Sequence, residues 1–334
     1  MKTILRRYGV FSVIALAALL SVAAPAHAQT KWRLAGNFAT EHSSSVAMNM
    51  FRDELAKASG GSFTVDVFPA MQLGGAQENV QNVRAGTLQM IWVGMAFLSR
   101  TVPELEAVSL PFQYESREQA YRVVDGPVGQ LLDAKLADKG LVSLGFFELG
   151  ARHVTNSKRP IKTLEDLKGL KIRMQPNETH LATFRALGAN PVAMDIKELY
   201  SAMQQGVVDG QENPFSVISA SRYFEVQKYI SNTGHFFDFI NVVANKKAFD
   251  SLSAAQQKML RDSMHKALVW QRDRARVEEN ESIAEIKKRA MQFDEVTPQF
   301  RGELRKASAG IVDEVKKRIG ADIVNQVQAE IAKK

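Results

Sequence analysis

The chain has 334 residues, of which 45% are hydrophobic and 24% charged, and its formal net charge is +7. It contains no cysteine, which excludes disulfides, thiolate metal sites and cysteine nucleophiles. Basic and acidic residues are interspersed and basic runs are short, so the sequence lacks the continuous basic stripe typical of nucleic acid binding. We therefore expect no nucleic acid partner, although a mild positive charge still favours anions.

The first 28 residues have the pattern of a secretory signal peptide. Basic residues at positions 2, 6 and 7 precede an apolar stretch centred on residues 14–20, and Ala26-His27-Ala28 supplies the small residues of a cleavage site. The apolar run falls short of the roughly 20 residues that a membrane-spanning helix needs. We expect cleavage after Ala28 and release of the mature protein into the periplasm, a compartment that suits an exported chain without disulfides.

Two blocks of alternating strand and helix patterns follow. About 300 mature residues exceed one ordinary core, because domains average roughly 150 residues, so we expect two α/β domains. The alternation indicates a largely parallel sheet with helices on its faces. The first block has strands at 31–34, 63–68 and 88–93 and helices at 42–58 and 76–85; the second has strands at 141–148, 170–174 and 191–194 and helices at 163–167, 179–187 and 197–205.

The C-terminal part of the chain is predicted to be helical. Residues 253–288 keep an apolar helical pattern without internal proline or glycine. A helix of about 36 residues would span roughly 54 Å, enough to brace two domains. Sustained apolar heptads are not evident, which disfavours a coiled coil. Two short helices, 298–307 and 311–319, and a frayed lysine-ended tail are expected to complete the chain.

Motifs of the common enzyme classes are missing from the sequence, including GxSxG, HExxH, a Walker loop and GxGxxG. The histidines after the signal show no i, i+4 pair, so we expect no metal and no cofactor. Glu212 and Asp209 could form a carboxylate pair for acid and base catalysis, which leaves a secreted hydrolase as one hypothesis. Their spacing across a turn gives the carboxylates no reason to converge, and we expect a protein that is not an enzyme.

Arg173 is a candidate binding residue because of its place in an apolar strand. It lies near the carboxyl end of Leu170-Lys171-Ile172-Arg173-Met174, and ligands of open α/β sheets bind at that end. A guanidinium gives a carboxylate two parallel charge-assisted bonds, which a lysine cannot reproduce. The alternative is that Arg173 and Lys171, on the same face by alternation, are solvated edge residues.

Asn213 is a second candidate. It ends the polar turn that starts at Val208, directly before Pro214, and it offers both a hydrogen-bond donor and an acceptor. An ordinary Asx turn before the proline explains the same residues, so composition alone leaves both interpretations open.

Two sequence blocks around these candidates resemble the DctP-type substrate-binding proteins of tripartite ATP-independent periplasmic (TRAP) transporters. Residues 164–173, LEDLKGLKIR, are similar to the family block "eDLKGLKiR", and residues 198–214, ELYSAMQQGVVDGQENP, to "evY.ALQ.gvvDGqEnp". Residues 224–228, FEVQK, are shared with sialic acid-binding members. The resemblance extends over the mature chain, from Asn37 through 72–74 and 110–112 to the C-terminal helices.

The resemblance implies an α/β, two-domain periplasmic binding protein fold with a long bracing helix and a ligand cleft between the domains. Domain I would comprise residues 29–150 and about 239–278, and domain II residues 151–238 and about 279–334. By position in the family pattern, Arg173 would clamp a carboxylate and Asn213 would approach the same group. Arg152 would be a second, more variable anion-binding arginine, and Asn37 would face the cleft.

Departures from the sialic acid binders bear on the ligand. Gly75 and Ala76 stand where those proteins have an acidic pair, the apolar Trp92-Val93-Gly94 replaces a strand glutamate, and Ile196 replaces an aromatic residue. A smaller or more apolar acid than sialic acid is therefore expected, although sugar acids, keto or hydroxy acids and aromatic acids all stay open. Four aromatic residues could form an apolar wall, or could simply belong to the core: Trp92, Phe38, Phe215 and Phe236.

The expected function is capture of a small organic acid through its carboxylate and its delivery to the membrane subunits of a TRAP transporter, with closure of the domains as the output. We expect the binding protein to be a monomer. An alternative is a periplasmic sensor that presents its closed form to a signalling receptor.

Overall fold

The computed structural model describes residues 29–289 and 291–333, so the expected signal peptide lies outside the described residues. Its strands are β1 Thr30–Gly36, β2 Phe63–Phe68, β3 Met90–Gly94, β4 Leu141–Asn156, β5 Lys171–Met174, β6 Asn190–Ala193, β7 Gly210–Asn213, β8 Tyr229–Asn245 and β9 Gln292–Glu295. They form one nine-stranded sheet in the order β2-β1-β3-β8-β4-β7-β5-β6, with β9 paired to β8.

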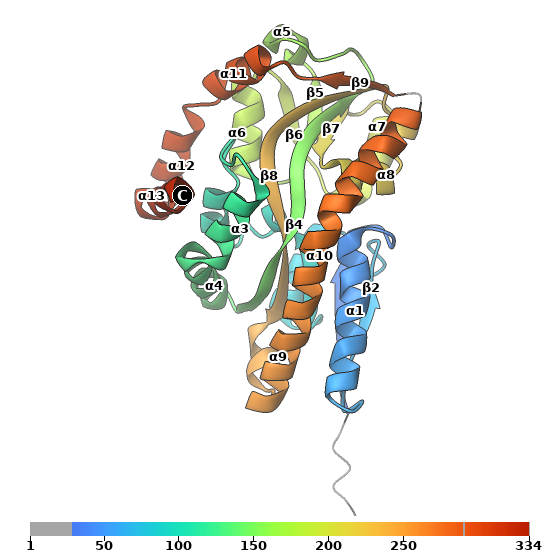
Figure 1. Ribbon diagram of the computed structural model, residues 1–334, viewed down its shortest axis with the longest axis vertical. Coiled ribbons are helices and arrows are strands. Elements are labelled where there is room, and N and C mark those ends of the chain that lie inside the picture. Colours follow the sequence, from blue (N-terminus) through green and yellow to red (C-terminus); the bar gives the residue numbers. More distant parts are fainter. Residues whose placement is uncertain (1–28, 290, 334) are drawn as a thin grey trace, which may run out of the picture.

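The long strands β4 and β8 run antiparallel through both ends of the molecule, from the pair Leu141 and Asn245 to the pair Asn156 and Tyr229 (Figure 1). At one end β1 pairs parallel with β2 and β3, and at the other β5 pairs parallel with β6 and β7. We call β1 to β3 with their helices the first lobe, and β5 to β7 with theirs the second lobe. The prediction of a largely parallel sheet holds within each lobe and is wrong for the centre, because β4 continues beyond the predicted strand and pairs with β8.

Helices cover this sheet and its ends. The α-helices are α1 Ser43–Ala58, α2 Ala76–Ala85, α3 Arg117–Asp125, α4 Pro127–Asp138, α5 Leu164–Leu167, α6 Glu178–Ala186, α7 Ile196–Gln204, α8 Phe215–Ala220, α9 Lys246–Asp250, α10 Ala254–Lys288, α11 Pro298–Ala307, α12 Ile311–Ile319 and α13 Ala321–Ala332. Short 3-10 turns are η1 Met95–Phe97, η2 Pro103–Val108 and η3 Tyr223–Glu225. In the described part of the chain, none of these helices is both long and apolar enough to cross a membrane.

Residues 253–288 were expected to form one long helix or two nearly collinear ones, and they form the single helix α10. Ser253 and Gln256 form a capping box at its start, which satisfies backbone N–H groups that the first turn leaves free. Midway, the Gln271 amide accepts a hydrogen bond from the Glu148 N–H at 2.9 Å and donates one to the Glu148 carbonyl at 2.9 Å. These bonds attach α10 to β4, and Figure 1 shows the helix running beside this strand.

The chain ends in a helix, and the predicted frayed tail is wrong. Ile323, Val324 and Val327 lie on one face of α13 and are buried. Gln119 of α3 donates to the Ile331 carbonyl at 3.0 Å, and Arg318 of α12 pairs with Glu106 of η2. The last two helices thus pack on elements that precede β4 in the chain.

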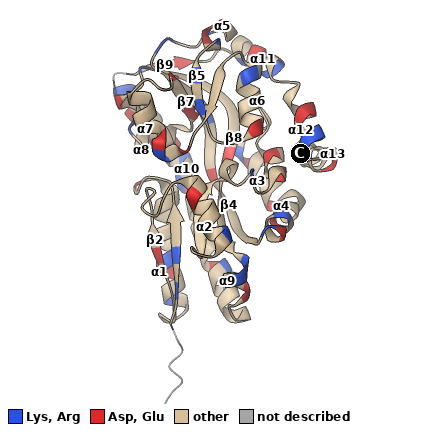
Figure 2. Ribbon diagram, turned by 180° about the vertical axis from the view of Figure 1, so that it is seen from behind, with Lys and Arg blue, Asp and Glu red and all other residues tan. Residues whose placement is uncertain are grey.

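Charged residues of both signs share the helices, as on α4 and α11 in Figure 2. The interspersed pattern of the sequence therefore carries over to the folded chain.

Candidate functional site

Arg173 is fully buried at the carboxyl end of β5, whereas Lys171 of the same strand is exposed. The Arg173 Nε donates to the Met194 carbonyl at 2.9 Å. Its Nη1 and Nη2 find no hydrogen-bond partner among the described residues. Burial lowers the pKa of Arg173 to about 10, so the side chain stays positively charged at neutral pH. A buried, charged guanidinium with both terminal nitrogens free is an arrangement that a carboxylate would complete.

Gln175 lies two residues further on, directly after the last residue of β5. Its Nε2 donates to Asp238 at 3.3 Å, and its Oε1 has no partner in residues 29–289 or 291–333. A Cβ placed on Gly94 would lie 3.0 Å from that Oε1, so Gln175 reaches the end of β3 in the first lobe. Sequence reasoning missed Gln175, although its spacing from Arg173 was a usable signal.

The first lobe contributes Trp92 from the middle of β3 and Asn37, which directly follows β1. Trp92 shares a strand face with Gly94, and its indole lies over Gly36, where a Cβ would come within 2.2 Å of the ring. Both Trp92 and Asn37 are buried, and the indole Nε1 and the Asn37 Oδ1 are without partners in the part of the chain that the structure describes. Both lobes therefore carry unpaired polar atoms around the ends of β1, β3 and β5, and Gln175 beside Gly94 joins the two lobes there.

Arg152 differs from Arg173, because its guanidinium is occupied. It donates from Nε to Glu212 Oε2 at 2.5 Å and from Nη2 to Glu212 Oε1 at 2.8 Å. Nη2 also lies 3.1 Å from Asn213 Oδ1, and Nη1 lies 3.4 Å from Asp238. Burial opposes both charges of the Arg152 and Glu212 pair, but their attraction outweighs it, so the pKa of Glu212 is lowered and that of Arg152 is raised. Neither Arg152 nor Asn213 offers an unpaired guanidinium or amide donor like those of Arg173.

Three of the predicted aromatic residues stack on histidines inside the protein. Ring centroids are 3.8 Å apart for Phe215 and His153, 4.1 Å for Phe236 and His180, and 4.9 Å for Phe38 and His42. Burial lowers the pKa of each of these histidines, which favours the neutral rings. Of the four aromatic candidates, Trp92 combines complete burial with an unpaired polar atom.

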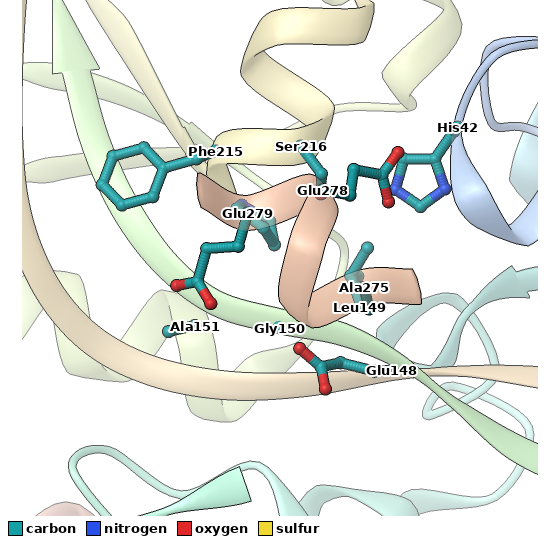
Figure 3. Close-up of a pocket in the computed structure, with 11 residues that line it drawn as sticks. His42, Glu148, Leu149, Gly150, Ala151, Phe215, Ser216, Ala275, Glu278 and Glu279 are labelled. Carbon is teal, nitrogen blue, oxygen red and sulfur yellow. The ribbon is translucent and has the colours of Figure 1, made fainter. Parts of the chain in front are cut away.

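A small pocket lies where β4 meets α8 and α10, and Figure 3 shows its lining. Glu278 points toward His42 there, and Glu148 and Glu279 lie on the other side. Glu279 and Glu148 both pair with Arg117 of α3, so these carboxylates connect elements around the crossing of β4. The ring of Phe215 is directed away from His42 in this view, which agrees with its stacking on His153.

Glu212 and Asp209 do not converge on a common site. Glu212 is bound to Arg152, while Asp209 accepts the Lys171 backbone N–H at 2.9 Å. Across residues 29–289 and 291–333, no cluster of three histidine or carboxylate side chains is arranged to hold a metal ion.

A sheet with two lobes and a polar site at the facing carboxyl ends of parallel strands defines a solute-binding protein. Residues 34–318 match the family described as bacterial extracellular solute-binding protein, family 7 (DctP), and the chain belongs to this family. The resemblance drawn from the two sequence blocks and the expected fold class are thereby confirmed.

Relatives and solved structures agree with this assignment. The 2,3-diketo-L-gulonate-binding periplasmic protein YiaO of Escherichia coli is 38% identical over 68% of this chain and 69% of its own length. The C4-dicarboxylate-binding periplasmic protein DctP of Rhodobacter capsulatus is 33% identical over 84% of this chain and 85% of its own length. The sugar acid binding protein DctPAm of Advenella mimigardefordensis, solved with galactonate, has a TM-score of 0.88 at 30% identity and covers 90% of this chain and 97% of its own. A TRAP periplasmic solute-binding protein of a Polaromonas species, bound to D-erythronate, has a TM-score of 0.86 at 35% identity. The match covers 90% of this chain and 98% of that protein.

Proposed function

We propose that this protein binds a small hydroxylated organic acid, with its carboxylate held by Arg173. The observation that carries the proposal is the buried guanidinium whose Nη1 and Nη2 lack partners among the described residues. A buried polar group left unpaired costs about 1–3 kcal/mol, and more when it is charged. A ligand carboxylate would remove that cost and neutralise the charge.

The remainder of the ligand is inferred from three further unpaired atoms. The unpaired Gln175 Oε1 and Asn37 Oδ1 can each accept a hydrogen bond from a ligand, and the unpaired Trp92 Nε1 can donate one. Hydroxyl groups both donate and accept, so they suit all three atoms, whereas an apolar acid would leave the three atoms unpaired. Galactonate and D-erythronate, the ligands of two similar structures, are acids of this kind. Within the acids left open by the sequence, we therefore favour a short sugar acid.

The protein would act in the periplasm and deliver the acid to the membrane subunits of a TRAP transporter, as a monomer and without catalysing a reaction. The family assignment supports transport, and YiaO and DctP are both described as periplasmic binding proteins. The sensor alternative gains no support from these comparisons. In this proposal Arg152, which is bound to both Glu212 and Asn213, sets the shape of the site beside Arg173 together with Asn213.

Thermal shift with a panel of organic acids tests the proposal. A ligand at 100 times its dissociation constant adds about 2.7 kcal/mol of stability. We expect aldonates of four to six carbons to raise the melting temperature and their deoxy or apolar analogues to raise it less. A panel in which only apolar or aromatic acids stabilise the protein would contradict the proposed ligand class.

Two substitutions test the arginine clamp. Arg173→Met removes the charge with little change in volume and should weaken binding by about 2 kcal/mol or more, or roughly 30-fold, in calorimetry. Its ligand-free stability should stay equal or rise, because an unpaired buried charge is removed. Arg173→Lys should also bind weakly, since a point charge loses the bidentate geometry.

Arg185→Ala is the control, because Arg185 is exposed on α6 of the same lobe and pairs with Glu178. If Arg173→Met binds an acid as tightly as the control variant does, Arg173 does not hold the ligand's carboxylate.

A further inference from the structure

Asp195 caps the start of α7 in the second lobe. Its Oδ1 accepts the Lys197 backbone N–H at 3.0 Å, an ordinary N-cap interaction that satisfies a free donor of the first turn. This bond uses a small part of what a carboxylate offers, since its two oxygens have about four lone-pair sites.

The same carboxylate also caps α2 in the first lobe. Asp195 Oδ2 accepts the Gln77 N–H at 2.8 Å, and Oδ1 lies 3.3 Å from the Ala76 nitrogen. The residue at the N-cap position of α2 is Gly75, which has no side chain of its own for this role. Two helix starts, each with a positive dipole end, thus share one negative charge across the lobes.

Gly75 makes this approach possible. A Cβ on Gly75 would lie 2.9 Å from Asp195 Oδ1 and 3.0 Å from the Asp195 carboxyl carbon, closer than van der Waals contact allows. The contact therefore requires a small residue on one lobe and a carboxylate on the other.

Asp195 is also adjacent to the proposed ligand clamp. The preceding residue, Met194, supplies the carbonyl that accepts the Arg173 Nε bond at 2.9 Å. The guanidinium that we assign to the ligand and the carboxylate that joins the lobes are thus held by neighbouring residues of one segment.

We infer that Asp195 is a latch that joins α2 to α7 and stabilises the closed arrangement of the lobes over the bound acid. The inference rests on the proposed function. Separation of the lobes breaks the two bonds to α2 and leaves the bond to α7 intact, so the latch favours only the closed arrangement. A contact shifts a two-state equilibrium by its differential free energy between the states.

Two single substitutions, one in each lobe, test the latch. Asp195→Asn keeps an N-cap for α7, because asparagine caps as well as aspartate, but removes the charge and one acceptor oxygen. Gly75→Ala leaves Asp195 in place and inserts a methyl group into the contact; the φ of Gly75, −68°, suits alanine. Gly302→Ala on α11 is the matched control, since its new methyl would meet nothing within 4 Å.

The readout is the distance between spin labels on α2 and α7, measured by pulsed electron paramagnetic resonance. The chain has no cysteine, so cysteines introduced at the exposed positions Gln81 and Ser201 can be labelled specifically. In ligand-free protein we expect a short-distance population whose ratio to the long-distance one falls about tenfold in either variant, or about 1.4 kcal/mol. The double variant should add little, because both changes remove one interaction.

Equal short-distance fractions in the wild-type, Asp195→Asn and Gly75→Ala proteins would overturn the latch. D-galactonate and D-erythronate provide a second readout: the variants should release a bound acid about tenfold faster, with association little changed. If neither these acids nor the wider panel binds the wild-type protein, the proposed function fails, and the ligand-free distances still decide the latch.

Discussion

At the scale of single residues, two buried arginines have the same chemistry and different partners. Arg152 is bound to Glu212 through Nε and Nη2, and its Nη1 faces Asp238, so its charge is compensated within the fold. Arg173 donates only its Nε among the described residues, to a backbone carbonyl. Partner count, and not burial, separates an arginine that holds the fold together from one that is ready for a ligand.

Trp92 offers a test of how the site recognises hydroxyl groups. Trp92→Phe keeps an aromatic ring over Gly36 and removes the unpaired Nε1 donor. We expect affinity for the bound acid to fall by about 0.5–1.5 kcal/mol, roughly two- to tenfold, because one hydrogen bond is lost. Isothermal calorimetry measures the change. Trp32→Phe is the control, since Trp32 packs edge-on against Phe63 in the core of the first lobe; equal affinities in both variants would show that the indole N–H does not meet the ligand.

At the scale of elements, the central pair of strands is irregular where the lobes meet. The register of β4 against β8 shifts between Ser143 and Gly145, between Glu148 and Gly150, and between Arg152 and Val154. Gly145 and Gly150 have positive φ angles of 138° and 109°, a region that other residues rarely adopt. Bulges re-aim side chains and bend strands, and here one register shift ends at Gly150, two residues before Arg152, and another directly follows Arg152.

Gly150→Ala tests whether this irregularity supports closure. The new Cβ would have ordinary contacts, 3.5 Å to Glu148 and 3.8 Å to Pro214, so the cost comes from the backbone angle and should be about 1–2 kcal/mol of stability. Gly140→Ala is a matched control, because Gly140 has a φ of 77° and open space around it. Both variants should lose stability in urea unfolding, but only Gly150→Ala should alter acid affinity. Equal affinities of the two variants would show that the irregular backbone at Gly150 does not influence ligand binding.

At the scale of the whole molecule, buried neutral histidines link stability to pH. Burial lowers the pKa of His180 to about 3 and also lowers those of His42, His153 and His235. Below the ordinary histidine value of 6.5 the unfolded chain binds protons that the folded chain cannot. The free energy of unfolding should therefore be independent of these groups above pH 7 and should fall as the pH drops below 6.5.

His180→Gln tests this linkage at one group. Between pH 6 and 4 the wild-type protein should lose about 1.4 kcal/mol per pH unit from His180 alone, because one proton is taken up on unfolding. The variant should lose the hydrogen bond between Ser109 and His180 at every pH, yet its stability should depend less steeply on pH. Urea titrations at several pH values measure both slopes; parallel curves for the two proteins would show that His180 does not titrate on unfolding.

Local sequence patterns determined much of the fold. Helix α10 was predictable because Ser253 and Gln256 cap it and no glycine or proline interrupts it. Helices α11 and α12 were predictable from their apolar spacing, and Thr297 with Pro298 also marks the start of α11. The pairing of β4 with β8 was not, because strand partners far apart in the chain leave no periodic signal. Helix α13 gains its stability from packing on α3, which a local pattern cannot reveal.

For the site, the sequence by itself determined that Arg173 lies at the carboxyl end of an apolar strand, where ligands of such sheets bind. Only the tertiary structure decided which polar groups stay unpaired: it bound Arg152 to Glu212, stacked Phe215 on a histidine, and left Arg173, Gln175 and Trp92 with free polar atoms. It also brought Asp195 to the start of α2. The physical reason is that hydrogen-bond satisfaction depends on partners from distant segments, which come together only when the sheet forms.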